Sequence, residues 1–289
     1  MDCRKVKETI VNWLVAQLKA SGQKGFVVGI SGGVDSALVS TLCAETGYPV
    51  LCLSMPILQA PDQLFKARLH MEWLKSTYKH IENMEVDLTE TFQIMLKSLG
   101  RTVSELSEVN TRSRLRMTTL YAMSNDLGYL VAGTGNKIED YGIGFFTLGG
   151  DGQVDCSPIG DLKKTEVWEL AKYVGVDDSI VKAKPTDGLW NDNRGDEDAI
   201  GASYPELEIA MDFCNQNPYL SLTVYNKLDN ILWTRLLRIS SYLGHGVGYI
   251  KRKVEELTPR QREVLEIYLK RHEATAHKMC MPPVCPIER

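Results

Sequence analysis

The residues best suited to chemistry lie in Ser31-Gly32-Gly33-Val34-Asp35-Ser36, which directly follows the apolar run at residues 26–30. Two adjacent glycines let backbone N–H groups point into one concavity, and a helix that begins here adds its partial positive end. Such a segment suits a phosphate or pyrophosphate group. It matches neither a Walker A loop nor the three-glycine dinucleotide fingerprint. Asp35 adds a carboxylate suited to a Mg²⁺ ion that bridges phosphate oxygens. The structural alternative is a turn that only lets strand and helix pack, which an Asp and two Ser disfavour.

A second polar segment, residues 133–139, follows another apolar run and contains Thr134 and Glu139. Loops at the switch point of a doubly wound sheet lie side by side. We therefore expect this segment beside residues 31–36. Glu139 would then complete a Mg²⁺ site with Asp35, and Thr134 would hydrogen-bond a nucleotide.

Two groups of basic residues are further candidates for an anion site. Lys163 and Lys164 stand at the predicted start of a helix, where the macrodipole disfavours a cation by a few tenths of a kcal/mol or more. This indicates that at least one of them faces an anion, the alternative being that both are solvated. Arg114 lies roughly opposite Arg112 and Arg116 on a helix that covers residues 110–117. One side of that helix is suited to pair with surface acids, and the other to reach a phosphate.

The elements that position these residues alternate along the chain. Apolar runs predict buried parallel strands at residues 26–30, 49–55, 80–88 and 128–133. Helices are predicted at residues 37–44, 61–79, 89–99, 109–125 and 163–174, the last with Asp161 as its N-cap. The alternation predicts an α/β fold, a doubly wound and mostly parallel sheet flanked by helices. After about residue 176 only loops and helices are expected, which predicts a helical C-terminal extension whose last helix opens with the capping box Thr258-Pro259-Arg260-Gln261.

Composition excludes several classes of protein. The 289 residues carry 33 basic and 37 acidic side chains, a net charge of −4, which argues against a nucleic-acid partner. No run of about 20 uninterrupted apolar residues is present, so no membrane partner is expected. The N-terminus predicts an amphipathic helix rather than a signal peptide. Seven cysteines without a CxxC pair favour reduced thiols and a cytoplasmic location.

The segment at residues 31–36 resembles the SGGxDS signature of the ATP pyrophosphatases, the PP-loop family, which split ATP between its α and β phosphates. Further blocks resemble ammonia-dependent NAD synthetase in the family's order. They are residues 110–117 (N-x-x-x-R-x-R-M), 133–139 (G-T-x-N-x-x-E), 144–151 (G-F-F-T-x-x-G-D) and 158–167 (P-x-x-x-L-x-K-T-E-V), then Pro185-Thr186, Asp196-Glu197 and His277-Lys278. Leu148 departs from this pattern, because many members have Lys there.

The resemblance implies that deamido-NAD is converted to NAD with ATP and ammonia through an acyl-adenylate, releasing AMP and pyrophosphate. ATP would be bound by Gly29, Ile30, Ser31, Gly32, Gly33, Val34, Asp35, Ser36, Thr134, Lys164 and Thr186. Deamido-NAD would be bound by Asn110, Arg114, Asp155, Glu197, His277 and Lys278. Asp35 and Glu139 would ligate Mg²⁺, and the catalytic residues would be Asp35, Lys164 and Asp151, the last near the ammonia site.

The resemblance also implies the organisation of the protein. One synthetase domain is expected over residues 1–289, with an N-terminal helix at 1–25, an α/β nucleotide-binding core at 26–176 and a loop and helical region at 177–289. A homodimer with the deamido-NAD site at its interface is implied. Because 25 residues precede the first strand and glutamine-dependent relatives carry an amidase domain there, the nitrogen donor is expected to be free ammonia or a separate glutaminase. Two alternatives remain: another PP-loop amidotransferase or ligase, and a nucleotide sensor without turnover.

Overall fold

The structure, a computed structural model, describes residues 1–186, 195–217 and 252–280. The chain forms two compact units. Unit 1 contains Met1–Lys137 and Phe145–Asp196, and unit 2 contains Ile138–Gly144 and Glu197–Arg289. The expected single domain with a boundary at residue 176 stays a prediction. Most of the stretch from 211 to 258, which is longer than the family resemblance leads us to expect, lies outside the described residues.

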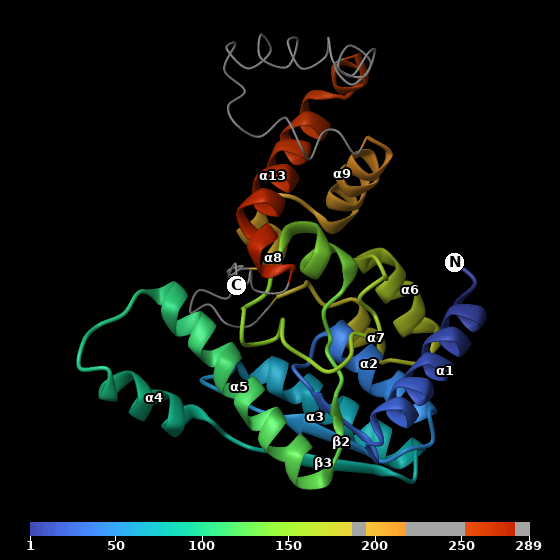
Figure 1. The fold of residues 1–289 in the computed structure, drawn as a ribbon, viewed down its shortest axis with the longest axis vertical. Helices are drawn as coiled ribbons and strands as arrows, with labels where there is room; N and C mark the ends of the chain where they lie inside the picture. Colours follow the sequence, from blue (N-terminus) through green and yellow to red (C-terminus); the bar gives the residue numbers. More distant parts are fainter. Residues whose placement is uncertain (187–194, 218–251, 281–289) are drawn as a thin grey trace, which may run out of the picture. The chain divides into compact units, whose positions relative to one another are not determined.

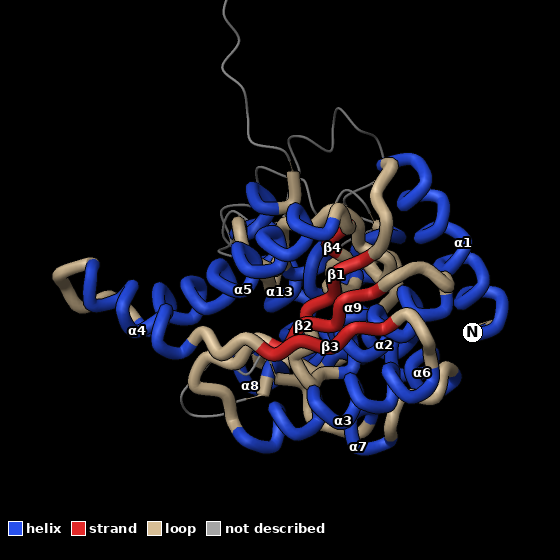
Figure 2. Tube along the Cα trace, turned by 90° about the horizontal axis from the view of Figure 1, so that it is seen from below, coloured by secondary structure: helices blue, strands red, loops and turns tan. Residues whose placement is uncertain are grey.

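The centre of unit 1 is a parallel sheet of four strands, shown in red in Figure 2. The strands are β1 (Phe26–Gly29), β2 (Val50–Ser54), β3 (Ile81–Glu85) and β4 (Leu130–Val131). Their order is β3-β2-β1-β4, and every neighbouring pair is parallel. The order reverses at β1, because β2 leaves on one side of it and β4 pairs on the other. This confirms the predicted fold class and places the switch point at the carboxyl end of β1.

Helices cover both faces of this sheet. The helices of unit 1 are α1 (Cys3–Ser21), α2 (Val34–Glu45), α3 (Pro61–Thr77), α4 (Thr89–Ser98), α5 (Glu105–Leu127), α6 (Lys164–Tyr173) and α7 (Asp178–Val181). Side chains alternate between the faces along each strand. Phe26 and Val28 pack with residues of α1, α2, α3, α6 and α7, whereas Val27 packs with residues of α4 and α5. The result is a layered α/β unit with an apolar core on each side of the sheet.

Most predicted elements are confirmed, although the strands predicted at 80–88 and 128–133 are shorter, and the starts of two helices also differ. The helix predicted from residue 109 begins at Glu105, because Ser104 caps it by accepting a hydrogen bond from the Ser107 N–H at 3.3 Å. The N-cap predicted at Asp161 is wrong. The helix begins after Lys163, whose N–H donates to the Glu166 carboxylate at 2.9 Å. Asp161 is instead paired with the ammonium of Lys137 at 2.6 Å.

Unit 2 is built mainly from helices (Figure 1). Its described elements are the π-helix η1 (Ile138–Ile143), α8 (Asp196–Ile200), α9 (Tyr204–Gln216), α13 (Pro259–Thr275) and the 3₁₀ turn η2 (Ala276–Lys278). Helix α13 begins with the predicted capping box at Thr258, which confirms that expectation. In the described parts of the chain, no helix combines the length and apolar composition needed to cross a bilayer.

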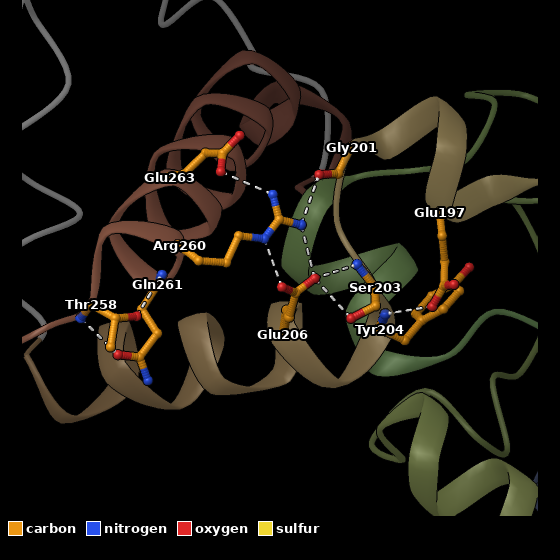
Figure 3. Close-up of polar contacts among 9 residues, drawn as sticks. All are labelled: Glu197, Gly201, Ser203, Tyr204, Glu206, Thr258, Arg260, Gln261 and Glu263. Carbon is orange, nitrogen blue, oxygen red and sulfur yellow. Dashed lines mark hydrogen bonds and ion pairs between the residues drawn. The ribbon is translucent and has the colours of Figure 1, made fainter.

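An ion pair joins α9 to α13 within unit 2 (Figure 3). Arg260 donates through Nε and Nη2 to the two carboxylate oxygens of Glu206 at 2.7 and 3.0 Å, and through Nη1 to Glu263 at 3.0 Å. Glu206 also accepts from the N–H of Ser203, the N-cap residue of α9, at 2.9 Å. The hydrogen bonds from Arg260 are the largest cause that lowers the pKa of Glu206 to about 2. This carboxylate therefore serves as a structural acceptor between the two helices.

Candidate active site

The glycine segment forms a tight loop between β1 and α2. Gly32 has a φ of +89°, and a Cβ at this position would collide with the main-chain oxygen of Gln63 on α3. Only glycine both adopts this positive φ readily and lacks the Cβ that would collide. Hydrogen bonds of Ser31 and Ser36 stabilise the loop internally. Ser36 Oγ accepts from the Ser31 N–H at 3.2 Å and donates to the Gly33 carbonyl at 2.9 Å.

The first turn of α2 carries no side-chain cap, as in α3 and α4, whereas α1, α5 and α13 are capped by Asp2, Ser104 and Thr258. Gly33 precedes the helix with an extended backbone. The first N–H groups of a helix have no partner within the helix. An uncapped first turn behind a glycine loop therefore presents its N–H groups to an anion.

Asp35 lies in the first turn of α2 and is held by two residues from other elements. Lys164 Nζ donates to its Oδ2 at 2.6 Å, and Asn136 Nδ2 donates to its Oδ1 at 3.1 Å. The side chain of Lys164 is 3% exposed and that of Asp35 is 18% exposed. Lys164 is the first residue of α6, so a lysine at a helix start is indeed turned toward the glycine loop, as its position predicted.

Asn136 was not selected from the sequence, although it stands in the segment at 133–139. It is fully buried, and its contact with Asp35 confirms that the part of this segment within unit 1, residues 133–137, lies beside the glycine loop. The pairing of β4 with β1 brings the two loops together. Thr134, in the same segment, is half-buried. Thr186 is exposed and directly precedes residues 187–194, which are not described.

A second group of predicted residues lies where α5 meets the loop at residues 147–151. Asn110 Oδ1 accepts from the Thr147 hydroxyl at 2.8 Å, and Arg114 Nε donates to the Leu148 carbonyl at 3.1 Å. Asp151 is exposed, yet its carboxylate accepts from the Ser113 hydroxyl at 2.5 Å and from the Thr147 N–H at 3.1 Å. Three of the predicted positions are thus gathered along one helix. Ser113, which aligns Asp151, was not predicted, because nothing in its spacing marks it.

Asp155 lies beside β4 in unit 1. Its Oδ2 accepts from the Val131 N–H at 2.8 Å, and its Oδ1 accepts from the Tyr121 hydroxyl at 3.1 Å. Burial and then the neighbouring Asp155 raise the pKa of Tyr121 to about 12. Tyr121 therefore remains a hydrogen-bond donor at neutral pH, and it fixes the orientation of Asp155.

The remaining predicted residues belong to unit 2. Glu139 is part of η1, and its Oε1 accepts from the hydroxyl of Tyr204 at 2.6 Å. Glu197 Oε1 accepts from the N–H of Tyr204 at 2.9 Å. His277 and Lys278 lie in η2, where Lys278 Nζ donates to the Gly144 carbonyl at 2.6 Å.

Mg²⁺ requires hard oxygen ligands, and carboxylates already held by other residues meet that requirement. Asp35 is held by Lys164 and Asn136, and Glu139 is held by Tyr204, so each fits the ion chemically. Asp35 belongs to unit 1 and Glu139 to unit 2, and their sharing of one cation stays a prediction. Within residues 1–186, 195–217 and 252–280, no group of three or more His, Cys, Asp or Glu side chains is arranged to hold a metal ion.

Comparison with known proteins agrees with these features. The NAD synthase family model matches residues 6–237. An NH(3)-dependent NAD(+) synthetase from Carboxydothermus hydrogenoformans is 41% identical over 207 residues, which cover 70% of this chain and 82% of that protein. One from Thermococcus kodakarensis is 42% identical over 210 residues, covering 72% and 80%.

Solved structures extend the similarity over almost the entire chain. The NMN synthetase from Francisella tularensis superposes with a TM-score of 0.79 at 26% identity, covering 99% of this chain and 100% of that one. The NH3-dependent NAD synthetase from Campylobacter jejuni has a TM-score of 0.71 at 26% identity with the same coverage. With the family model matching most of its residues, the chain belongs to the NAD synthase family.

Proposed function

We propose that this chain catalyses the ATP-dependent amidation of deamido-NAD to NAD with ammonia, a ligase reaction that releases AMP and pyrophosphate. The observation that carries the proposal is the arrangement of Asp35, which two buried side chains, Lys164 and Asn136, hold at an uncapped helix start behind a glycine loop. We assign this loop to the phosphates of ATP, because backbone N–H groups at a helix start behind a glycine loop suit a phosphate.

The first half-reaction joins two anions. The nicotinate carboxylate attacks the α-phosphorus of ATP, the bond to the bridging oxygen breaks, and pyrophosphate leaves. The N–H groups at the start of α2 are suited to bind the phosphates, and the ammonium of Lys164 adds positive charge beside them. We assign Asp35 and Glu139 as the residues that would hold Mg²⁺, which neutralises charge on the transferring and leaving phosphates when bound. Thr134 and Thr186 are assigned to ATP with the loop residues.

The second half-reaction needs ammonia as a neutral nucleophile. NH₃ attacks the carbonyl carbon of the acyl-adenylate, AMP leaves, and the extra proton passes to a base. Asp151 suits this role because it is an exposed residue whose carboxylate is oriented by Ser113 and Thr147. Asn110, Arg114 and Asp155 of unit 1, and Glu197, His277 and Lys278 of unit 2, are assigned to deamido-NAD.

We assign free ammonia as the nitrogen donor, with a separate glutaminase as a partner that would deliver it. The ammonia-dependent relatives support this, since the chain covers 82% and 80% of the length of two of them. The six described cysteines are all free thiols, which fits a cytoplasmic location.

We also propose that the chain is a homodimer with deamido-NAD bound at the interface. Helix α4 and its C-cap residue support this, because the helix buries only Phe92 while Ile94, Met95 and the C-cap Leu99 are 56%, 42% and 49% exposed. Exposed apolar side chains that form a contiguous patch are a feature of association surfaces. Light scattering after size exclusion tests this, and a monomeric mass at micromolar concentration would contradict it.

The test of the reaction is an incubation with Mg-ATP, deamido-NAD and ammonium chloride. NAD is measured by reduction with alcohol dehydrogenase, and AMP and pyrophosphate are measured by chromatography. Equal yields of the three products are expected, and Asp35→Ala should abolish them while the far-UV circular dichroism stays unchanged. Nicotinate mononucleotide serves as the comparison substrate, because one structural neighbour is an NMN synthetase. Nucleotide binding without AMP release would instead identify a sensor.

A further inference from the structure

Tyr204 contacts two acidic residues to which the sequence assigns different roles. Its hydroxyl donates to Glu139 Oε1 at 2.6 Å, and its backbone N–H donates to Glu197 Oε1 at 2.9 Å. Figure 3 shows the second of these bonds. Tyr204 is the first residue of α9 and is fully buried. One residue therefore holds the carboxylate assigned to the metal and the carboxylate assigned to the dinucleotide.

The backbone of η1, which carries Glu139, is held by other residues. His272, Thr275 and Lys278 hydrogen-bond to three successive carbonyl oxygens at residues 142–144, at 2.7, 3.1 and 2.6 Å. His272 donates in the tautomer that carries its proton on Nδ1. These bonds fix the carboxyl end of η1 independently of Tyr204. Removing the Tyr204 hydroxyl therefore changes the restraint on the Glu139 side chain and leaves the restraints on the η1 backbone in place.

We propose that Tyr204 is a positioning residue that orients the Glu139 carboxylate for Mg²⁺ and, through a separate atom, orients Glu197 for the dinucleotide. The inference rests on the proposed function, because it takes Glu139 as a metal ligand. A partner that orients a metal ligand typically contributes about 10- to 100-fold to metal affinity. Tyr204→Phe deletes the hydroxyl but keeps the ring and the N–H that bonds to Glu197. The variant should therefore affect the metal and leave dinucleotide binding unchanged.

The test measures binding separately from turnover. The probe is α,β-methylene-ATP, which cannot be split between its α and β phosphates, and its affinity is measured by calorimetry as the Mn²⁺ complex and as the metal-free nucleotide in EDTA. In Tyr204→Phe the affinity for the Mn²⁺ complex should fall about tenfold or more, while the affinity for the metal-free nucleotide stays the same. In rate assays, the Mg²⁺ concentration for half-maximal rate should rise, and the KM for deamido-NAD should not.

The matched control is Tyr78→Phe, which also deletes a hydroxyl that donates to a glutamate, Glu45 Oε1 at 3.0 Å. Glu45 ends α2 and is not a site residue, so this variant should bind both forms of the nucleotide like the wild type. In a Glu139→Gln background, Tyr204→Phe should cause no further loss. If Tyr204→Phe does not fold, Tyr204→Met, whose flexible apolar side chain adapts to an irregular cavity and carries no hydroxyl, repeats the test.

A wild-type affinity for the Mn²⁺ complex in a folded Tyr204 variant would overturn the inference. Equal losses for the complex and the metal-free nucleotide would also overturn it, because they would show a structural effect on the whole site. A wild-type chain that forms no NAD would instead refute the proposed function, and that result comes from a different assay.

Discussion

The ion pair between Lys164 and Asp35 gives the sharpest prediction. Two unit charges 2.6 Å apart attract each other by roughly 6 kcal/mol at an effective dielectric constant of about 20, before the cost of desolvation. Removing one partner of a buried pair costs about 3–5 kcal/mol of unfolding free energy, because the other charge stays in a poorly solvated place. Lys164 is 3% exposed and Asp35 is 18% exposed. Asp35→Asn should therefore cost more than Lys164→Met, since the ammonium is the more deeply buried charge.

The double variant tests the origin of these losses. With both charges gone, Asp35→Asn/Lys164→Met should be as stable as Asp35→Asn or more stable, so that the two losses are strongly non-additive. A loss of 3–5 kcal/mol corresponds to a fall in Tm of roughly 6–20 °C for a protein of this size. All three variants should lose NAD formation, because both residues are assigned to the reaction.

Urea unfolding followed by fluorescence measures the three free energies, and the coupled dehydrogenase assay measures activity. If the double variant lost as much unfolding free energy as the two single variants together, Lys164 and Asp35 would not interact in solution. Lys164→Met with wild-type activity would remove Lys164 from the mechanism, whatever its stability. Either result would refute the reasoning from the 2.6 Å contact.

Three further outcomes are expected. Burial lowers the pKa of His70 from 6.5 to about 4, so the unfolded chain binds more protons than the folded chain below pH 6.5. The free energy of unfolding that His70 contributes is therefore complete above about pH 6.5 and falls by roughly 2–4 kcal/mol as the pH approaches 4. His70→Gln should flatten this part of the pH profile of stability measured by urea unfolding. Gly32→Ala should lose more stability and ATP affinity than Gly47→Ala, because both glycines have positive φ but only Gly32 would bring a Cβ against another backbone; equal effects in calorimetry and urea unfolding would contradict this. A chromogenic disulfide reagent at pH 8 should label the exposed Cys280 in the native protein, and mass mapping that finds native labelling at any of the four buried cysteines, whose pKa values burial raises, would contradict the described core. Those four are Cys43, Cys52, Cys156 and Cys214.

Local patterns were sufficient to predict the sheet and the position of the glycine loop. Apolar runs of strand length between helical segments predict parallel order, and that order alone places residues 133–139 beside residues 31–36. The Asn136–Asp35 hydrogen bond confirms this placement for residues 133–137, which belong to unit 1. The unfavourable position of a lysine at a helix start also predicted that its side chain faces an anion, and Lys164 is turned inward to the carboxylate of Asp35.

Other contacts could not be predicted, because they join residues far apart in the sequence. Tyr204 and Glu139 are separated by 65 positions, and no periodicity relates them. In the sequence, Ser113 is not distinguished from other polar residues of its helix. Its role is visible only in the folded chain, where its hydroxyl donates to Asp151. The wrong N-cap at Asp161 has a local reason. Glu166 accepts from the N–H of Lys163, so the helix begins after Lys163 and not after Asp161. The metal site and the assignments to deamido-NAD remain predictions.

Helix α2 is buried on nearly every side, since ten of its residues from Val34 to Ala44 are buried. Almost every side chain of this helix is packed in the core, so substitutions in it destabilise the fold before they change the chemistry of the site. Directed evolution toward a different nucleotide should consequently find its productive changes in the neighbouring loops, such as that around Thr134, and very few in this helix. A library that leaves α2 untouched would sacrifice little diversity and retain far more folded clones.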